Sequence, residues 1–345
     1  MKVAHFHFGT EGGAERFFVN LVNSLAERGV EQKFVIRPNR IWRDEIAGCG
    51  DIIEGHFRSV SLSQYWLQWK TRQMINRFKP DAIMAWMPRA SRLMPDYKDA
   101  LKITRLGDYP ANLKHFTNID VLVGITPDIS RHCKNLGWLK RIETIPLFAK
   151  DLDPVPVSRA DMDTPEDAFV VSCAGRFVPR KGMDTLIRAV AKLDNAWLWL
   201  VGDGADKEDF IKLAKEVGLS DRLRMPGWQK EPFHTLAASD VSCFPSRHEP
   251  FGNSGVEAWR LGLPLVSARS QGPSWYVKDG ENGLLVDIDD VDGFATAIQH
   301  LRDDPELCKT LVAGGHKALD TVFSKETVTD QFMELFSGKK VQNPY

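Results

Sequence analysis

Two glutamates, Glu249 and Glu257, enclose a glycine-containing turn in the segment RHEPFGNSGVEAW. The turn follows VSCFPS, a buried-type strand, and leads into the apolar helical segment GVEAWRLGL. Amides at a helix start are unpaired and carry partial positive charge, so the backbone of Gly252, Asn253 and Ser254 predicts a phosphate site. A carboxylate repels a phosphate, so each glutamate is expected to accept hydrogen bonds from hydroxyls instead. A nucleotide sugar offers this combination, because its diphosphate lies between a sugar and a ribose.

A simpler interpretation of these residues stays open at this point. Glu249 could be a solvated loop residue, and Glu257 a carboxylate that is favoured near a helix start. The preceding strand and the two glycines, Gly252 and Gly255, favour a ligand site.

Short β-branched and aromatic runs alternate with helical patterns along the chain, which is typical of α/β proteins. In the first half, strands are predicted for KVAHFHF, EQKFVIR, DAIMAWM, LKITRLG, VLVGIT and IETIPLF. AERFFVNLVNSLAERG predicts an amphipathic helix that ends at Gly29. After AKDLDPVPVSRADMDTPED, interpreted as a linker, strands are predicted for AFVVSCAGRF, AWLWLVGDG, LRMPGW, VSCFPS and LPLVSAR.

This alternation predicts two doubly wound α/β domains with parallel sheets. The boundaries expected are 1–150 for the first domain and 151–323 for the second, with a C-terminal helix at about 324–345 that packs back on the first. Ligands of such folds bind at the carboxyl ends of the strands, so a cleft between two facing sheets is the expected site.

Composition excludes several classes of protein. Lysine and arginine number 45 against 46 aspartates and glutamates, so no strong field indicates a nucleic-acid partner. The five cysteines lie far apart without a CxxC pair, which argues against a zinc knuckle or a disulfide framework and favours a reducing compartment. No apolar run reaches the roughly 18 residues of a membrane-spanning helix, and the apolar run at the start is too short for the core of a signal peptide. A cytoplasmic protein is expected.

The segment SRHEPFGNSGVEAWRLGLPLVSA resembles the E-x7-E signature of retaining glycosyltransferases of the GT4 family. GGAERFFVNLVNSLAERG, AGRFVPRKGMDTLIRAVAKL, LVGDG and VKDGENGLLVD are similar to further segments of that family, so the resemblance covers nearly the whole chain. It implies the GT-B fold, two facing Rossmann-like domains, and transfer of a sugar from a nucleotide-diphosphate sugar with retention at the anomeric carbon.

The resemblance also implies roles for individual residues of the second domain. Glu249 would contact hydroxyls of the donor sugar and Glu257 the ribose, while the amides of the turn hold the diphosphate. Arg176 and Lys181 of GRFVPRKG would be the positive partners of the diphosphate. Cations that stabilise charge developing on a leaving group often supply the largest catalytic effect. Neither a metal nor another cofactor is expected, because helix N-termini and basic residues supply this charge.

Candidates in the first domain lie after three predicted strands. Gly12 and Gly13 of GTEGGAERF form a strand-to-helix turn that is not GxGxxG; the resemblance places it over the diphosphate, and a tight turn that needs positive φ explains it equally. Family members commonly have a His-Asp pair where KITRLGDYP offers Gly107 and Asp108. Asp108 either orients the acceptor or contacts the donor sugar, or it caps a local turn. Arg89 of WMPRAS is a candidate for a phosphate or an acidic sugar of the acceptor. The scattered histidines are expected to be packing or surface residues rather than ligands; they are His5, His7, His115 and His132.

The segment SLSQYWLQWKTRQMINRFKP predicts a helix whose exposed face gives information on the class of acceptor. One face, expected in the core, consists of Leu67, Thr71, Met74, Ile75 and Phe78. Trp66 and Trp69 fall opposite, near Arg72 and Arg77. Exposed tryptophan beside arginine suits a bilayer interface, and the alternative is that both tryptophans pack on a neighbouring element. The first interpretation predicts a membrane-borne acceptor, such as lipopolysaccharide core or a lipid-linked saccharide, and peripheral contact with the inner face of the membrane.

Two other functions fit the same architecture. A GT-B nucleotide-sugar epimerase would need an acid and a base at the sugar carbon, and no such pair is assigned. A non-catalytic nucleotide-sugar-binding protein stays open because the family histidine is absent.

Overall fold

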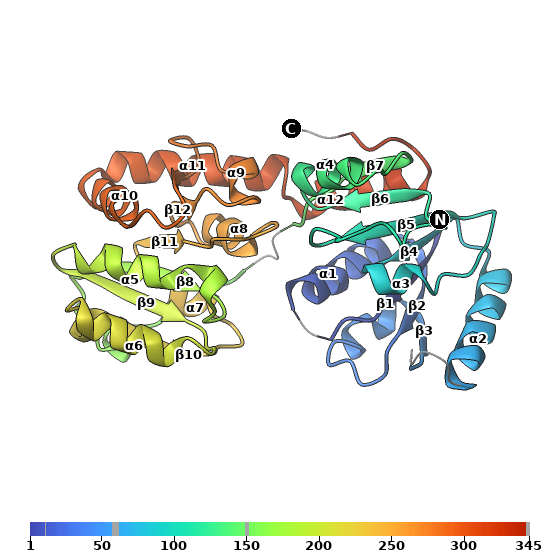
Figure 1. Ribbon diagram of the computed structural model, residues 1–345, viewed down its shortest axis with the longest axis horizontal. Helices are drawn as coiled ribbons and strands as arrows, with labels where there is room; N and C mark the ends of the chain where they lie inside the picture. Colours follow the sequence, from blue (N-terminus) through green and yellow to red (C-terminus); the bar gives the residue numbers. More distant parts are fainter. Residues whose placement is uncertain (11, 57–61, 149–151, 343–345) are drawn as a thin grey trace. The chain divides into compact units, whose positions relative to one another are not determined.

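The structure, a computed structural model, describes residues 1–10, 12–56, 62–148 and 152–342, without the side chains of 62–64. The chain divides into two compact units (Figure 1). Unit 1 comprises Met1–Lys150 and Val322–Tyr345, and unit 2 comprises Asp151–Thr321.

Unit 1 is built on a parallel sheet of seven strands in the order β3-β2-β1-β4-β5-β6-β7. The strands are β1 (Lys2–His7), β2 (Glu31–Ile36), β3 (Gly50–Glu54), β4 (Ala82–Ala85), β5 (Leu101–Leu106), β6 (Val121–Gly124) and β7 (Arg141–Thr144). The helices are α1 (Gly13–Glu27), η1 (Asp44–Cys49), α2 (Leu62–Phe78), α3 (Pro88–Ser91), α4 (Pro127–Asn135) and α12 (Lys325–Phe336). The order reverses between β1 and β4, which makes this sheet doubly wound.

The C-terminal helix α12 belongs to unit 1 because it packs on α1. The hydroxyls of Ser24 and Thr329 are hydrogen-bonded at 2.8 Å in buried surroundings, and Arg28 Nη1 lies 2.8 Å from Asp330 Oδ1. Phe332 and Phe336 are buried, so α12 completes the apolar core over α1.

Unit 2 has a parallel sheet of six strands in the order β10-β9-β8-β11-β12-β13. The strands are β8 (Phe169–Ala174), β9 (Ala196–Val201), β10 (Leu223–Gly227), β11 (Val241–Phe244), β12 (Leu265–Ala268) and β13 (Leu284–Val286). The helices are η2 (Ala160–Met162), η3 (Pro179–Lys181), α5 (Met183–Ala191), α6 (Lys207–Glu216), η4 (Ser220–Arg222), α7 (Phe233–Leu236), α8 (Asn253–Arg260), α9 (Pro273–Tyr276), α10 (Val291–Asp303) and α11 (Pro305–Thr321). The switch in strand order lies between β8 and β11.

The segment interpreted as a linker is, from residue 152 onward, largely fastened to unit 2. Arg159 donates hydrogen bonds to three backbone carbonyls and lies 2.9 Å from Asp240. Trp199 Nε1 donates to Thr164 Oγ1 at 3.1 Å. The polar and proline-rich composition of this segment is therefore that of a loop packed on the surface of unit 2, not of a free linker.

The predicted strands of both halves are present, and two further strands, β3 and β13, were missed. Helix α8 begins at Asn253, two residues before the predicted start at Gly255. Asn253 and Ser254 therefore lie in its first turn, while Gly252 occupies the N-cap position.

Candidate active site

Two loops of unit 2 bring the predicted donor-site residues together. One follows β8 and contains Arg176 and Lys181, and the other follows β11 and contains Glu249 and Gly252. Strands β8 and β11 are neighbours in the sheet, so both loops lie at the carboxyl edge where the strand order reverses. This is the place at which doubly wound sheets bind their ligands.

Lys181 and Glu249 form an ion pair in this edge. Lys181 Nζ lies 2.6 Å from Glu249 Oε2, and their side chains are only 14% and 15% exposed. The ammonium also lies 5.3 Å from the centre of the Phe244 ring. An ion pair that is this well buried is screened less than a surface pair, so the two charges hold each other in place.

Gly252 allows the loop to enter helix α8. Its backbone is left-handed, with φ 91 and ψ 72, and a Cβ there would lie 2.5 Å from Phe244 Cε1. Tyr276 Oη donates a hydrogen bond to the Gly252 carbonyl at 2.9 Å. No described side chain caps α8, so the first amides of this helix keep the anion-binding character that the sequence predicted.

Glu257, in the second half of α8, is partly buried and close to the same charges. Burial raises its pKa, and the positive charge of Lys181 opposes the rise. Burial together with the charges of Glu249 and Glu257 holds the pKa of Tyr276 well above its usual range. The charge of Glu257 therefore interacts with both Lys181 and Tyr276. The phenol of Tyr276 stays protonated as a hydrogen-bond donor.

Tyr276 and Arg247 are two residues of this site that the sequence analysis missed. Arg247 holds Asp184 through both terminal nitrogens, at 2.9 and 2.6 Å, and lies 2.7 Å from Asp289. Its backbone amide donates to the Arg180 carbonyl at 2.9 Å. Arg247 thus ties the Glu249 loop to the segment that ends in Lys181, and a bidentate pair of this kind fixes geometry.

Arg176 differs from the other candidates because its side chain is exposed. It follows Gly175, and a Cβ added to Gly175 would lie 3.7 Å from Lys181 Cε. The backbone that carries Arg176 therefore lies close to the side chain of Lys181. An exposed guanidinium on this edge is available to an anion that arrives from solvent.

Replacing Gly252 by alanine is expected to destabilise the protein by more than its backbone strain alone. Left-handed backbone costs an L-residue about 1–2 kcal/mol, and here the Cβ would also collide with Phe244. Gly218 is the matched control, because its φ is 74 and no atom of the described part of the chain lies within 4 Å of its added Cβ. Free energies of unfolding from denaturant titration should fall for both variants and fall further for Gly252→Ala. Equal losses would contradict the packing described around Gly252.

The candidates of unit 1 lie at the carboxyl edge of its own sheet. Gly12 has φ 152 and is the N-cap of α1, Gly13 begins that helix after β1, and Arg89 is exposed on α3 after β4. Asp108 follows β5, is exposed, and its Oδ1 accepts a hydrogen bond from the Tyr109 amide at 2.7 Å. Asp108 thus lies at this edge, with one carboxylate oxygen hydrogen-bonded to the next amide of the chain.

Among the described residues, no group of three or more histidine, cysteine, aspartate or glutamate side chains is arranged to hold a metal ion. The acidic run at 287–290 instead caps a helix, because Asp290 Oδ1 accepts from the Gly293 amide at 2.8 Å.

Comparison with known proteins shows the family. Residues 155–318 match the family described as glycosyl transferases group 1. The lipopolysaccharide core biosynthesis glycosyltransferase LpsE of Rhizobium meliloti (strain 1021) is 52% identical over 98% of this chain and 100% of its own length. LpsD of the same organism, which has the same description, is 50% identical over 97% of this chain and 98% of its own length.

Solved structures show the same fold. Anabaena Alr3699/HepE, crystallised in complex with UDP and glucose, is 21% identical, covers 98% of this chain and 99% of its own, and has a TM-score of 0.77. The predicted GT-B fold and the resemblance to this family are confirmed. Full-length similarity to named transferases also favours the transferase over the epimerase and the non-catalytic binder. The chain belongs to the glycosyl transferases of group 1 and is a glycosyltransferase.

Proposed function

We propose that this enzyme transfers a sugar, with retention, from a nucleotide-diphosphate sugar to a saccharide or lipid-linked acceptor in lipopolysaccharide core synthesis. The observation that carries this proposal is the Lys181–Glu249 ion pair beside Glu257 and the uncapped start of α8. The acceptor class rests on similarity to the two Rhizobium relatives, which are lipopolysaccharide core biosynthesis glycosyltransferases.

In this proposal, unit 2 binds the donor. The amides of Gly252, Asn253 and Ser254 receive the diphosphate at the start of α8. Arg176 and Lys181 neutralise its charge as the bond to the sugar breaks. Glu249 accepts hydrogen bonds from hydroxyls of the transferred sugar, and Glu257 from those of the ribose.

The two carboxylates are used for recognition, so a covalent glycosyl-enzyme intermediate is not proposed. An acceptor hydroxyl oxygen bonds to the anomeric carbon while the bond from that carbon to the diphosphate oxygen breaks. The proton of the acceptor passes to the departing phosphate oxygen on the same face, which gives retention without a protein base.

The protein itself supplies the positive charge of the donor site, and residues of unit 1 complete the substrate site in this proposal. The helix start and the two cations supply the positive charge that the leaving diphosphate needs, so we infer that neither a metal nor a cofactor takes part. Gly12 and Gly13, in the loop at the start of α1, would lie over the diphosphate of the donor, while Arg89 and Asp108 contact the acceptor from the edge of unit 1. Arg89 would bind a charged group and Asp108 a hydroxyl.

Thermal unfolding of the full chain with UDP, GDP, ADP and CMP sugars tests the donor class. A ligand that binds the native state at a hundredfold excess over Kd adds about 2.7 kcal/mol of stability. UDP sugars are the first choice, since the Anabaena protein was crystallised in complex with UDP and glucose. A shift with one nucleotide family supports the proposal. A shift that is unchanged in the Glu249→Ala, Glu257→Ala double variant would place the donor elsewhere.

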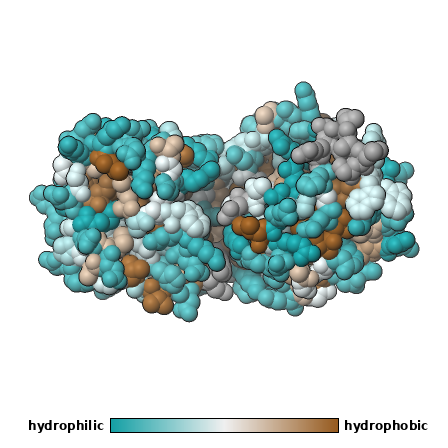
Figure 2. Space-filling view, turned by 90° about the horizontal axis from the view of Figure 1, so that it is seen from below, coloured by the Kyte–Doolittle hydropathy of each residue, from teal (hydrophilic) through white to brown (hydrophobic). Residues whose placement is uncertain are grey.

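We also propose that unit 1 contacts the membrane through helix α2. On the face shown in Figure 2 the surface is mainly hydrophilic, with small separate hydrophobic patches. Tyr65, Trp66 and Trp69 are 66%, 52% and 56% exposed on α2, while Leu67 and Ile75 are each 1% exposed in the core. The tryptophans are therefore exposed rather than packed on a neighbour. No helix in the described ranges is long and apolar enough to cross a bilayer.

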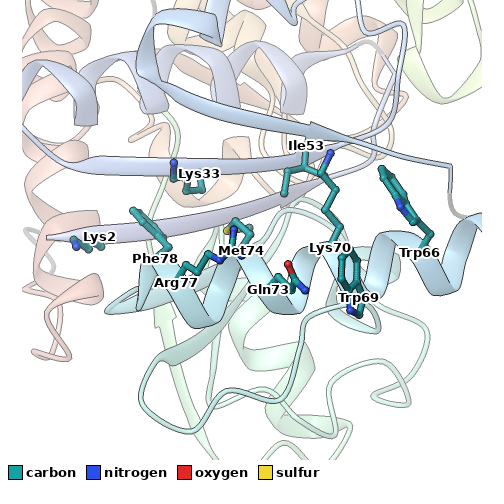
Figure 3. A pocket seen from close by; sticks show the side chains of 10 residues that line it. All are labelled: Lys2, Lys33, Ile53, Trp66, Trp69, Lys70, Gln73, Met74, Arg77 and Phe78. Carbon is teal, nitrogen blue, oxygen red and sulfur yellow. The ribbon is translucent and has the colours of Figure 1, made fainter.

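A groove of 540 Å³ runs beside these tryptophans (Figure 3). The groove is lined by aromatic and apolar side chains together with four cationic ones. The lining residues are Lys2, Lys33, Ile53, Trp66, Trp69, Lys70, Gln73, Met74, Arg77 and Phe78. Lys33 pairs with Asp51, and Lys2 lies 3.9 Å from Glu31. Aromatic rings beside cations suit the headgroup level of an anionic membrane.

Replacing both Trp66 and Trp69 by alanine is expected to reduce binding to vesicles of phosphatidylglycerol. The two rings form, with Tyr65, the exposed aromatic surface of the described part of α2, so their loss removes most of the surface proposed to enter the interface. Trp228→Ala is the matched control, because Trp228 is 68% exposed on unit 2. Vesicle flotation measures the effect, and equal recovery of all three proteins would rule out α2 as the contact.

A further inference from the structure

Arg105 is a buried cation in the sheet of unit 1. It is the penultimate residue of β5 and is only 1% exposed. Its guanidinium carbon lies 4.6 Å from the centre of the Phe17 ring and 5.5 Å from that of Trp86. Aromatic faces attract a cation, but they do not use its hydrogen-bond donors.

Within the described residues, Arg105 has neither an ion pair nor a hydrogen-bond partner for its buried Nε. Two other buried polar atoms at the same edge also lack a partner: His7 Nε2 at the end of β1, and Thr126 Oγ1 just after β6. His7 is 1% exposed and Thr126 is fully buried. Thr126 is the N-cap residue of α4, yet its hydroxyl makes no capping hydrogen bond. Strands β1, β4, β5 and β6 are consecutive, so these groups follow the carboxyl edge across the switch in strand order.

The orphan atoms are donors, or in the case of Thr126 can donate. His7 Nδ1 accepts the Gly9 amide at 3.1 Å, so Nε2 carries the imidazole proton. Burial lowers the pKa of His7 to about 3, which keeps the ring neutral. Burial lowers the pKa of Arg105 to about 9, and the charge of Glu15 opposes this, so Arg105 remains a cation at neutral pH.

Positive charge exceeds negative charge around Arg105. Glu15 is the buried carboxylate whose charge acts on it, and its Oε1 lies 1.7 Å from where a Cβ of Gly9 would be. Arg40 is a second, partly buried cation that feels Glu15, and its Nε also lacks a partner. A buried charge without a full partner is costly, so an external anion would complete the group.

Gly107 lies between the buried guanidinium and the surface. It is exposed, and among the described residues the atom within 4 Å of its added Cβ is Arg105 Nη1, at 3.8 Å. A side chain at this position would stand between Arg105 and an arriving ligand, whereas glycine does not.

We propose that the carboxyl edge of the unit 1 sheet binds an anionic group of the acceptor saccharide, a phosphate or a carboxylate, with Arg105 as its central cation. His7 and Thr126 are the neutral donors beside it, and Gly107 is the point of entry. The choice of acceptor rests on the proposed function, in which the donor diphosphate is bound by Arg176, Lys181 and the start of α8. The cluster thus selects acceptors that carry a charge at the correct distance from the reacting hydroxyl.

Calorimetric titration of the full chain with UDP, and of the UDP-saturated chain with inorganic phosphate, tests this site, because UDP occupies the anion site proposed in unit 2. Arg105→Met should weaken phosphate binding by roughly tenfold to a hundredfold, the range for lost hydrogen bonds to a charged group, and leave the affinity for UDP unchanged. Gly107→Val keeps the charge but covers it, so it should weaken phosphate binding as well. Arg131→Met is the matched control, since Arg131 is an exposed arginine of α4 paired with Asp128.

Stability separates a binding role from a structural one. A buried cation whose partner is a ligand destabilises the ligand-free protein. Arg105→Met should therefore unfold at the same temperature as the wild type or higher. A fall in unfolding temperature together with normal phosphate binding by Gly107→Val would overturn the proposal. Weakened UDP binding in both variants would reassign the cluster to the donor and overturn the acceptor role. Absence of UDP binding by the wild type would instead count against the proposed function, and phosphate titration of the chain without UDP would then test the cluster by itself.

Discussion

Lys181→Met is expected to lower kcat by about two to three orders of magnitude, the usual effect of removing one donor that stabilises developing charge. The ammonium lies 2.6 Å from Glu249, and its charge also acts on Glu257, so it stands between the groups assigned to the sugar and to the ribose. KM for the donor should change less than kcat, because the charge on the diphosphate grows as the bond breaks.

Lys192→Met is the control for this prediction, because Lys192 follows helix α5 of the same unit and pairs with Asp292 at the surface. Lys181→Met leaves Glu249 without its partner, so unfolding temperatures are measured beside steady-state rates. The double variant Lys181→Met, Glu249→Gln removes both charges and should regain stability without regaining activity. Activity near the wild-type level in either variant would show that Lys181 does not serve the leaving group.

Glu257→Ala is expected to weaken UDP binding by roughly tenfold to a hundredfold, the range for a lost hydrogen bond to a charged group. Its carboxylate is partly buried, so the hydroxyls it accepts from are bound away from bulk water. Glu257→Gln keeps one acceptor oxygen and should lose less. Calorimetric titration with UDP measures both.

Glu208→Ala is the matched control, since Glu208 is an exposed carboxylate in the first turn of α6 in the same unit. It tests whether a glutamate on a helix of this unit matters in general. An unchanged Kd for UDP in both Glu257 variants would remove Glu257 from the ribose site.

The fold was largely predictable because its central strands are long apolar runs. FVVSCA and AWLWLV alternate with helices that have clear apolar faces, and both are present as β8 and β9. Strands β3 and β13 were missed for a physical reason: GDIIE is polar at both ends, and LLV has only three residues between turns. Such short edge strands form through pairing with a neighbour, which a local pattern does not report.

The candidate site was predictable where its residues are close in sequence. Gly252, Asn253, Ser254 and Glu257 follow one strand and enter one helix, so their common location followed from local rules. Tyr276 contacts Gly252 from helix α9. The two residues are far apart in sequence and meet only through tertiary packing, which local rules do not predict. The burial of Arg105 was equally hidden, because the alternation in LKITRLG does not say that a charged side chain turns inward.

Transfer of radiolabelled sugar from a nucleotide-diphosphate sugar to lipopolysaccharide core saccharide is the decisive measurement for the proposed reaction. We expect label to enter the acceptor only when enzyme, donor and acceptor are all present, and Lys181→Met to lower the rate by about two to three orders of magnitude. We also expect the same anomeric configuration in the product as in the donor. Label that stays in the donor, or an inverted linkage in the product, would contradict the proposed retaining transfer.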